Sequence, residues 1–307
     1  MSNAITAAWW EILILLLIPT ALYTCQIVFH NKIKKVFNNY WVWIGIAIAY
    51  LAYFIGVVWT PNIIDCPSSA WGHSWSNPLD SSGSRHISWV FCLDVCQFAA
   101  LFIPIAIIAD PTRKVARTLA PTAIVGGVFT LITRVIFDAD TTLSLRYIFI
   151  GVDYPNHAGF YMYHVVNMAL AIGLLLNTPK ANKRGLLQMT MLQCAYYAYV
   201  GIIIAATTAT YSVAGLTFHD FMEGGNFKQI GNAFGSPYLA LVLFHIVTFG
   251  CAIGIWALND YVFKTRAWKY GNVLNHNRKE VYNYNKFTKL PDFWRGFKKI
   301  KQSKNTK

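Results

Sequence analysis

Polar side chains that could do chemistry interrupt several hydrophobic stretches of this 307-residue sequence. The ionisable and amide residues are Asp94, Gln97, Arg134, His164, Asn167 and His245, and a thiol, Cys96, lies two residues after Asp94. A charged group in hydrocarbon is costly, so it normally faces the interior of a helix bundle and marks a functional path. An arginine suits the phosphate of a lipid headgroup. These residue types therefore predict a polar pocket for a phospholipid headgroup or its ester.

The elements that must position these residues follow from composition. The sequence is 55% hydrophobic and 13% charged, whereas soluble domains have about 25% charged residues. Seven stretches approach the roughly 20 apolar residues that a transmembrane helix needs. They lie at about 8–29, 40–58, 89–109, 118–137, 160–176, 187–211 and 238–258. The sequence therefore predicts an all-α, polytopic membrane protein.

Lys and Arg residues are distributed unevenly over the connections between these stretches. They cluster after the first, third and fifth stretches and after residue 258, and none precedes the first stretch. Basic loops remain on the cytoplasmic side, which predicts an outside N-terminus and a cytoplasmic C-terminus. We therefore expect a bundle of seven transmembrane helices over residues 1–258 in the cell membrane, followed by a basic cytoplasmic tail over residues 259–307.

In this orientation the polar residues lie at similar depth, in the outer halves of their helices. Gln97 follows Asp94 by three residues and Asn167 follows His164 by three, so each pair shares one helix face. The outer connections are also long, which is typical of functional loops. The residues expected to bind substrate in the shared pocket are Arg134, Asn167, Gln97, His245 and Thr207.

Two points of geometry stay open. Arg134 either pairs with Asp94 across helices or pairs with Asp138 one turn further along its own helix. Residues two apart point about 200° apart on a helix, so Cys96 faces away from a pocket that Asp94 faces. Both could be used only if the third helix is central or if Pro104 distorts it.

The sequence predicts neither a metal centre nor a cofactor. The six cysteines are spread along the chain without the spacing of zinc ligands, and no glycine-rich phosphate loop or nucleotide motif is visible. The two histidines, His164 and His245, have a second interpretation as histidines that are hydrogen-bonded inside the bundle.

The third to fifth stretches carry a family resemblance. Residues Leu93 to Phe98 are followed by the run Pro104 to Ile108, a short basic turn, the Gly126-Gly127 pair and the sequence Phe160 to His164. This order resembles the YwaF-type bacterial membrane proteins, which are relatives of a eukaryotic transmembrane acyltransferase that remodels ether phospholipids. The resemblance covers roughly residues 89–258.

The resemblance implies roles for three residues. Cys96 matches the acyl-carrying nucleophile and His164 matches the base, while Asp94 stands where the family has its first histidine and Val165 stands in place of a glycine. Asp94 would orient a histidine, as the third member of such arrangements does, or hold Arg134 over the phosphate. The expected catalytic residues are therefore His164, Asp94 and Cys96.

The alternative is a non-enzymatic subunit of a larger complex, either a substrate-binding transporter component or a scaffold. Its support is the tail, which carries 13 Lys and Arg residues against three acidic residues. Such a segment binds anionic lipid at about 1 kcal/mol per basic residue near the surface, and it could dock an acidic protein partner. We favour a lipid or protein contact over nucleic acid. The residues expected to make it are Arg295, Lys298, Lys299 and Lys301.

Overall fold

The fold is helical throughout the part of the chain that the computed structural model describes. That part comprises residues 17–21, 24–25, 36, 39–64, 66–137, 160–178, 184–223, 225 and 227–259. Within these ranges there is no strand, and a single isolated β-bridge joins Ser74 to Asn77. The all-α prediction is therefore confirmed. The predicted first stretch is described only in fragments, and the basic tail lies outside the described residues.

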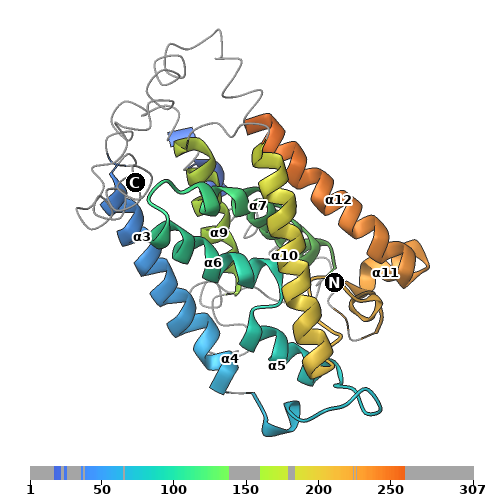
Figure 1. Cartoon of the computed structure of the whole chain (residues 1–307). Coiled ribbons are helices and arrows are strands. Elements are labelled where there is room, and N and C mark those ends of the chain that lie inside the picture. The colour runs from blue at the N-terminus through green and yellow to red at the C-terminus, as the bar shows by residue number, and fades with distance from the viewer. Residues whose placement is uncertain are drawn as a thin grey trace, which may run out of the picture.

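Twelve elements are described (Figure 1). They are α3 (Tyr40–Tyr53), the π-helix η1 (Phe54–Trp59), α4 (Thr60–Ile64), the 3₁₀ helix η2 (Ser68–Ala70), α5 (Ser81–Phe91), α6 (Val95–Ala109), α7 (Lys114–Phe137), α9 (Phe160–Asn177), α10 (Arg184–Thr207), the 3₁₀ helix η4 (Phe218–Phe221), α11 (Lys228–Phe234) and α12 (Pro237–Ala257). In Figure 1, α5 and α11 lie toward one end of the long helices, away from the end where α12 finishes.

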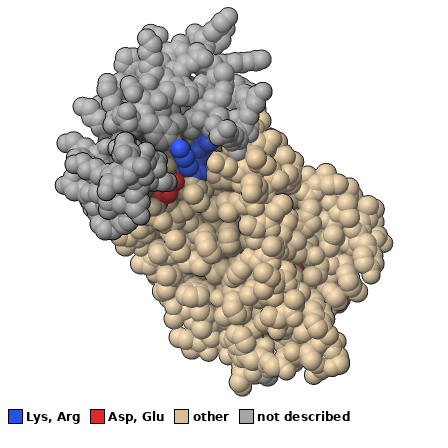
Figure 2. Space-filling view, in the orientation of Figure 1, with Lys and Arg blue, Asp and Glu red and all other residues tan. Residues whose placement is uncertain are grey.

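Five helical segments among the described residues are long and apolar enough to cross a membrane. They are Tyr40–Trp59, Ser81–Ala109, Lys114–Ile132, Gly185–Thr207 and Pro237–Ala257, and a shorter apolar helix spans Met162–Asn177. Their outward side chains suit a lipid environment: on the face that Figure 2 shows, most of the described surface carries no acidic or basic side chain. Six of the seven predicted stretches therefore correspond to apolar helices.

The third predicted stretch is not one continuous helix, which corrects the expectation for residues 89–109. Helix α5 ends at Phe91, Cys92 adopts a left-handed conformation with φ 51°, and α6 begins after the extended residue Asp94. The left-handed region costs a residue with a Cβ roughly 1–2 kcal/mol. Broken helices occur at membrane depth where they are buried in protein or line a cavity.

The break between α5 and α6 is stabilised by side chains from two other helices. Backbone groups freed by a helix end need partners, and the indole Nε1 of Trp59 donates to the carbonyl oxygens of Trp89 (3.0 Å) and Val90 (3.2 Å). The hydroxyls of Tyr199 and Tyr196 donate to the carbonyls of Phe91 and Leu93, each at 2.5 Å. These side chains therefore stabilise the break, because they donate hydrogen bonds to carbonyl groups that a continuous helix would have paired internally.

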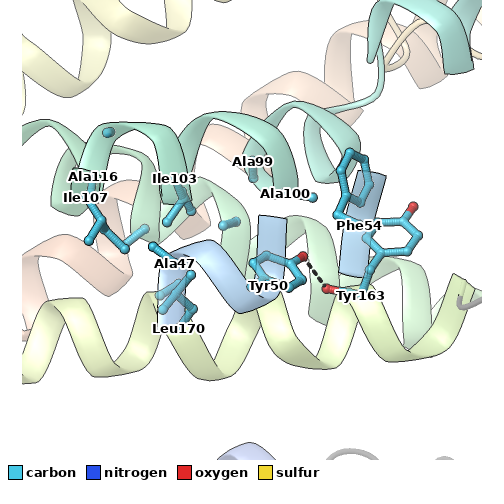
Figure 3. Close-up of a cluster of buried hydrophobic side chains, with 14 of the residues drawn as sticks. Ala47, Tyr50, Phe54, Ala99, Ala100, Ile103, Ile107, Ala116, Tyr163 and Leu170 are labelled. Atoms are coloured by element: carbon cyan, nitrogen blue, oxygen red, sulfur yellow. Dashed lines mark hydrogen bonds between the residues drawn. The ribbon is translucent and has the colours of Figure 1, made fainter. Parts of the chain in front are cut away.

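A buried tyrosine joins three helices of the core. The hydroxyl of Tyr50 donates to Asn167 Oδ1 at 2.8 Å and lies 3.1 Å from the carbonyl oxygen of Tyr163. The amide of Asn167 in turn donates to the carbonyl of Cys96 at 2.8 Å. Figure 3 shows Tyr50 and Phe54 beside Tyr163. These contacts connect α3, α6 and α9 and fix the start of α6.

Helix α7 packs closely against α6 and α9 because two adjacent glycines leave room. A Cβ on Gly126 would lie 2.8 Å from Cys96 Sγ and 2.9 Å from a Val95 methyl carbon, and a Cβ on Gly127 would meet Met168. The Gly126-Gly127 pair therefore allows α7 to approach the residues that begin α6.

Replacing Gly126 with alanine is expected to lower the free energy of unfolding by about 1–3 kcal/mol, the range for overpacking a core. The added methyl group would push Val95 and Cys96 out of place. Thermal unfolding in detergent micelles measures the change. The matched control is Gly250→Ala on α12, where nothing lies within 4 Å of the new Cβ and helix propensity predicts a neutral or slightly stabilising effect. Equal stability of the two variants would contradict close packing at Gly126.

Candidate functional site

A cavity of about 150 Å³ lies where the α5–α6 break meets α7, α9, α10, α12 and the segment 212–227. This volume is many times the roughly 10–15 Å³ that one water molecule needs. The polar residues around it include Ser88, Asp94, Cys96, Gln97, His164 and Ser212. Tyr196, Tyr197 and several phenylalanines supply aromatic walls. The cavity is therefore a mixed polar and aromatic chamber inside a bundle of apolar helices.

Four of the sequence-predicted site residues line this one cavity. They are Asp94, Cys96, Gln97 and His164. The expectation that Cys96 faces away from Asp94 is wrong, because it assumed a continuous helix. Asp94 has extended backbone angles, φ −73° and ψ 142°, and precedes the first turn of α6. The angle of about 200° between residues two apart on a helix therefore does not apply to Asp94 and Cys96.

The carboxylate of Asp94 does not cap the helix that it precedes. Its Oδ1 accepts a hydrogen bond from the backbone N–H of Ala214 at 3.2 Å, and its Oδ2 lies 3.4 Å from the amide nitrogen of Gln97. Asp94 therefore connects the start of α6 to the segment between α10 and α11. The first backbone N–H groups of α6, which carry partial positive charge, have no side-chain cap.

Three buried polar atoms at the cavity have no hydrogen-bond partner among the described residues. They are Ser88 Oγ, Gln97 Oε1 and Ser212 Oγ, and their residues are 0%, 2% and 2% exposed. A buried polar atom without a partner costs about 1–3 kcal/mol, so native proteins seldom leave one without a reason. Three such atoms around one cavity indicate a site built for a polar ligand or ordered water.

Cys96 is held from several sides. Its side chain is buried, its Sγ lies 3.9 Å from the hydroxyl of Thr130, and the space beyond the sulfur is kept by Gly126. Asn167 fixes its carbonyl group, as described above. The thiol therefore has a defined position at the cavity wall.

The segment that covers the cavity is organised by Asp220, a residue that the sequence did not single out. The carboxylate of Asp220 is fully buried and accepts hydrogen bonds from the backbone N–H groups of Ser212, Val213 (3.1 Å) and Gly215 (2.8 Å). Burial and the nearby Asp94 charge raise the pKa of Asp220 to about 7, although the three N–H donors lower it. Asp220 therefore positions the segment that bears Ser212 and Ala214.

His245 has both ring nitrogens in hydrogen bonds within the protein. Its Nε2 lies 2.8 Å from the carbonyl oxygen of Gly215 and its Nδ1 lies 2.9 Å from the hydroxyl of Tyr197. A carbonyl only accepts, so Nε2 carries the proton, and Tyr197 donates to Nδ1 in the neutral ring. His245 therefore links α10, α12 and the segment around Gly215 instead of lining the described cavity wall.

The other predicted binding residues either make contacts away from the cavity or lie outside the described residues. Asn167 connects α3 and α6 and is not among the described residues that line the cavity. Thr207 donates to the carbonyl of Ile203 within its own helix. Arg134 belongs to α7, but its side chain lies outside the described residues, as do Arg295 and the tail lysines Lys298, Lys299 and Lys301. The predicted Asp94–Arg134 and Arg134–Asp138 pairs therefore stay predictions.

Fold and site together define a class: a helical protein with five segments able to cross a membrane and a polar chamber at a break between two of its helices. The chain belongs to a family of unknown function (DUF5378), whose model matches residues 14–290.

Two relatives come from mycoplasmas. The chain is 25% identical over 239 residues to the uncharacterized protein MG135 homolog of Mycoplasma pneumoniae, covering 71% of this chain and 80% of that protein. It is 21% identical over 182 residues to the uncharacterized protein MG135 of Mycoplasma genitalium, covering 58% of this chain and 64% of that protein, less than two thirds of its length. No solved structure matches the chain.

Proposed function

We propose that this is a multi-pass protein of the cell membrane that binds a phospholipid at the cavity and transfers or hydrolyses its acyl group. The observation that carries the proposal is that Cys96, His164 and Asp94 all line one cavity, which also has buried polar atoms without partners among the described residues. The proposed topology has seven spans, with the N-terminus outside, because basic residues cluster in alternate connections and in the tail. The cavity then lies in the outer half of the membrane.

The proposed chemistry proceeds through an acyl-cysteine. His164 takes the thiol proton as Cys96 Sγ attacks the carbonyl carbon of the lipid ester, and the C–O bond then breaks. The alkoxide leaves with the proton from His164. In the second half, His164 removes a proton from an acceptor hydroxyl or water, which attacks the thioester and releases Cys96. The proton returns to the thiol, so the protein is unchanged after one cycle.

The start of α6 supplies the remaining features that such a reaction needs. Cys96 belongs to the first turn of α6, where backbone N–H groups without a side-chain cap can stabilise the oxyanion of the tetrahedral intermediate. Asp94 acts as a positioning residue because it holds both Ala214 and Gln97. The resemblance to YwaF-type proteins supports the same roles for Cys96 and His164.

The test is an acyl-transfer assay on protein reconstituted into lipid nanodiscs with phospholipid labelled in its acyl chain. We expect release or exchange of the label, and we expect His164→Ala to reduce it by about 10²–10⁴-fold, the usual contribution of a general base. The matched control is His73→Ala, which changes a histidine that does not line the cavity. Turnover that survives His164→Ala unchanged would remove this histidine from the mechanism.

A second proposal concerns the basic tail. Its excess of Lys and Arg favours a peripheral contact with anionic lipid or with an acidic protein partner at the inner membrane surface. Truncation after Tyr270 is expected to weaken binding of the protein's cytoplasmic side to anionic vesicles, or to release a stoichiometric partner that co-purifies with the full chain. Unchanged behaviour in both measurements would contradict the contact and, with it, the scaffold alternative.

A further inference from the structure

The cavity has two chemically different ends. Near the α5–α6 break, its walls carry the three buried atoms without partners, on Ser88, Gln97 and Ser212. Further along α7 and α12 the walls include the apolar and aromatic residues Val125, Phe129, Phe249 and Ala252. The polar side chains at this end already have partners in the protein: Thr122 donates to Gln193 at 3.5 Å, and Thr248 donates to the carbonyl of Phe244. A ligand that satisfies both ends must itself have a polar and an apolar part.

The apolar end extends well into the bundle. The lining residues of α7 run from Thr130 to Thr122 and those of α12 run from Phe244 to Ala252. In each set the first and last residues are eight steps apart along the helix, which is about 12 Å at 1.5 Å per step. The two helices pack against one another and run in opposite directions, so these residues form a narrow slot between them.

The side of the slot that faces α10 and α12 is partly exposed. Both helices are largely exposed, with only 17% of each apolar segment buried. Tyr197 and His245 join them by a hydrogen bond. On the side of this bond away from Gly215, the lining residues Gln193, Thr248 and Phe249 are partly exposed rather than buried. The Tyr197–His245 bond thus forms one edge of an opening.

The size of the cavity limits what can occupy it. About 150 Å³ is below the roughly 300–1,000 Å³ of pockets for drug-sized ligands. One extended alkyl chain fills such a slot, whereas the two chains of a phospholipid would need more room.

We infer that the slot between α7, α10 and α12 is a binding site for a single alkyl chain of a membrane amphiphile, which enters sideways from the lipid between α10 and α12. Its polar group then lies at the α5–α6 break, within reach of Gln97 and the two serines. This inference rests on the proposed function, which places the protein in a membrane. It adds the route by which the ligand enters, and it identifies an alkyl chain as the part of the ligand that the cavity holds.

The test uses a long-chain fatty acid with a diazirine near its methyl end, added to the full chain in lipid nanodiscs and activated by light. Peptide mass spectrometry should place the label on the slot residues, at Val125, Phe249 or Ala252. Ala252→Phe fills the slot and should reduce this labelling several-fold, whereas Cys251→Phe changes an exposed neighbour and should leave it unchanged. Label confined to outward-facing residues such as Ile246 and Val247 would overturn the inference.

A measurement on the unaltered protein guards against a variant that fails to fold. Excess unlabelled long-chain fatty acid should suppress the slot labelling, and a short-chain analogue should not, because it cannot reach the inner end. Equal suppression by both would overturn the inference. Slot labelling without acyl turnover would support the alkyl-chain site and contradict the catalytic proposal. Acyl turnover without slot labelling would support the catalytic proposal and contradict the alkyl-chain site.

Discussion

Cys96→Ala is expected to reduce acyl transfer to the uncatalysed background, a loss of ~10⁴-fold or more, which is the scale seen when a nucleophile is removed. The sulfur forms the covalent bond in the proposed reaction, and among the described residues Cys96 is the one cysteine that lines the cavity. The wild-type protein, quenched during turnover, should carry a thioester on the peptide that contains Cys96. Mass spectrometry measures the adduct, and hydroxylamine should remove it.

The matched control is Cys92→Ala. Cys92 is also buried, precedes Cys96 by one helical turn in sequence, and does not line the cavity. Alanine keeps a Cβ at its left-handed backbone position, so the strain there is unchanged. We expect this variant to retain the adduct and most of the turnover. Full activity in Cys96→Ala would contradict covalent catalysis and would favour a binding protein.

Asp220→Ala is expected to lower the free energy of unfolding by about 3 kcal/mol or more when measured near pH 5. The change leaves the N–H groups of Ser212, Val213 and Gly215 without their acceptor, and each buried unpaired group costs about 1–3 kcal/mol. The segment that bears Ala214 would also loosen its bond to Asp94. Thermal or denaturant unfolding in detergent micelles measures the stability, and lipid binding should weaken in parallel.

The control for this variant is Glu223→Ala in the same segment. Glu223 is exposed and forms a surface ion pair with Lys228 at 2.6 Å, so its loss should cost at most about 1 kcal/mol. If both acidic substitutions had the same small effect, Asp220 would not organise the segment.

The pH dependence of stability gives a second readout on Asp220. Its pKa of about 7 in the folded protein exceeds the value near 3.9 in an unfolded chain, so the folded state binds more protons between these values. The contribution of Asp220 to the free energy of unfolding therefore falls as pH rises from about 4 to about 7, and it levels off above that range. The stability difference between wild type and Asp220→Ala should shrink over the same window. A difference that grows with pH would contradict a raised pKa.

Hydropathy predicted most of the helical framework. The bounds of α3 with η1, of α9 and of α12 differ from the predicted stretches by one residue or so. The start of α7 lies four residues earlier than predicted, because Asp110 accepts hydrogen bonds from the backbone N–H groups of Lys114 and Val115 and so caps the helix. A long run of apolar residues favours a helix in lipid whatever its neighbours are, so these helices could be predicted from the sequence alone.

The helix break could not be predicted in the same way. Residues 89–109 are continuously apolar apart from Asp94 and Gln97, and neither glycine nor proline marks the left-handed turn at Cys92. What makes the break stable are donors distant in sequence, on Trp59, Tyr196 and Tyr199. Local propensity carries no information about such partners.

The candidate site was predicted in part for a related reason. Polarity at a similar depth grouped Asp94, Gln97 and His164, and these three residues line one cavity. It could not separate them from Asn167 and His245, whose polar groups are used in contacts between helices. Asp220 was missed because it lies within the long connection between α10 and α12, where an acidic residue is ordinarily solvated.

The most direct test of the account is whether the side chains at positions 96 and 164 meet across α6 and α9. In a variant that keeps Cys96 as its single native cysteine, His164→Cys should allow a short bifunctional thiol reagent to join the two sulfurs, detected as one cross-linked pair of peptides. Val166→Cys, two residues further on α9, should not cross-link. Efficient cross-linking at 164 alone is the predicted result. A thiol at 164 that reacts only with lipid-dissolved reagents, and never with Cys96, would contradict the shared chamber.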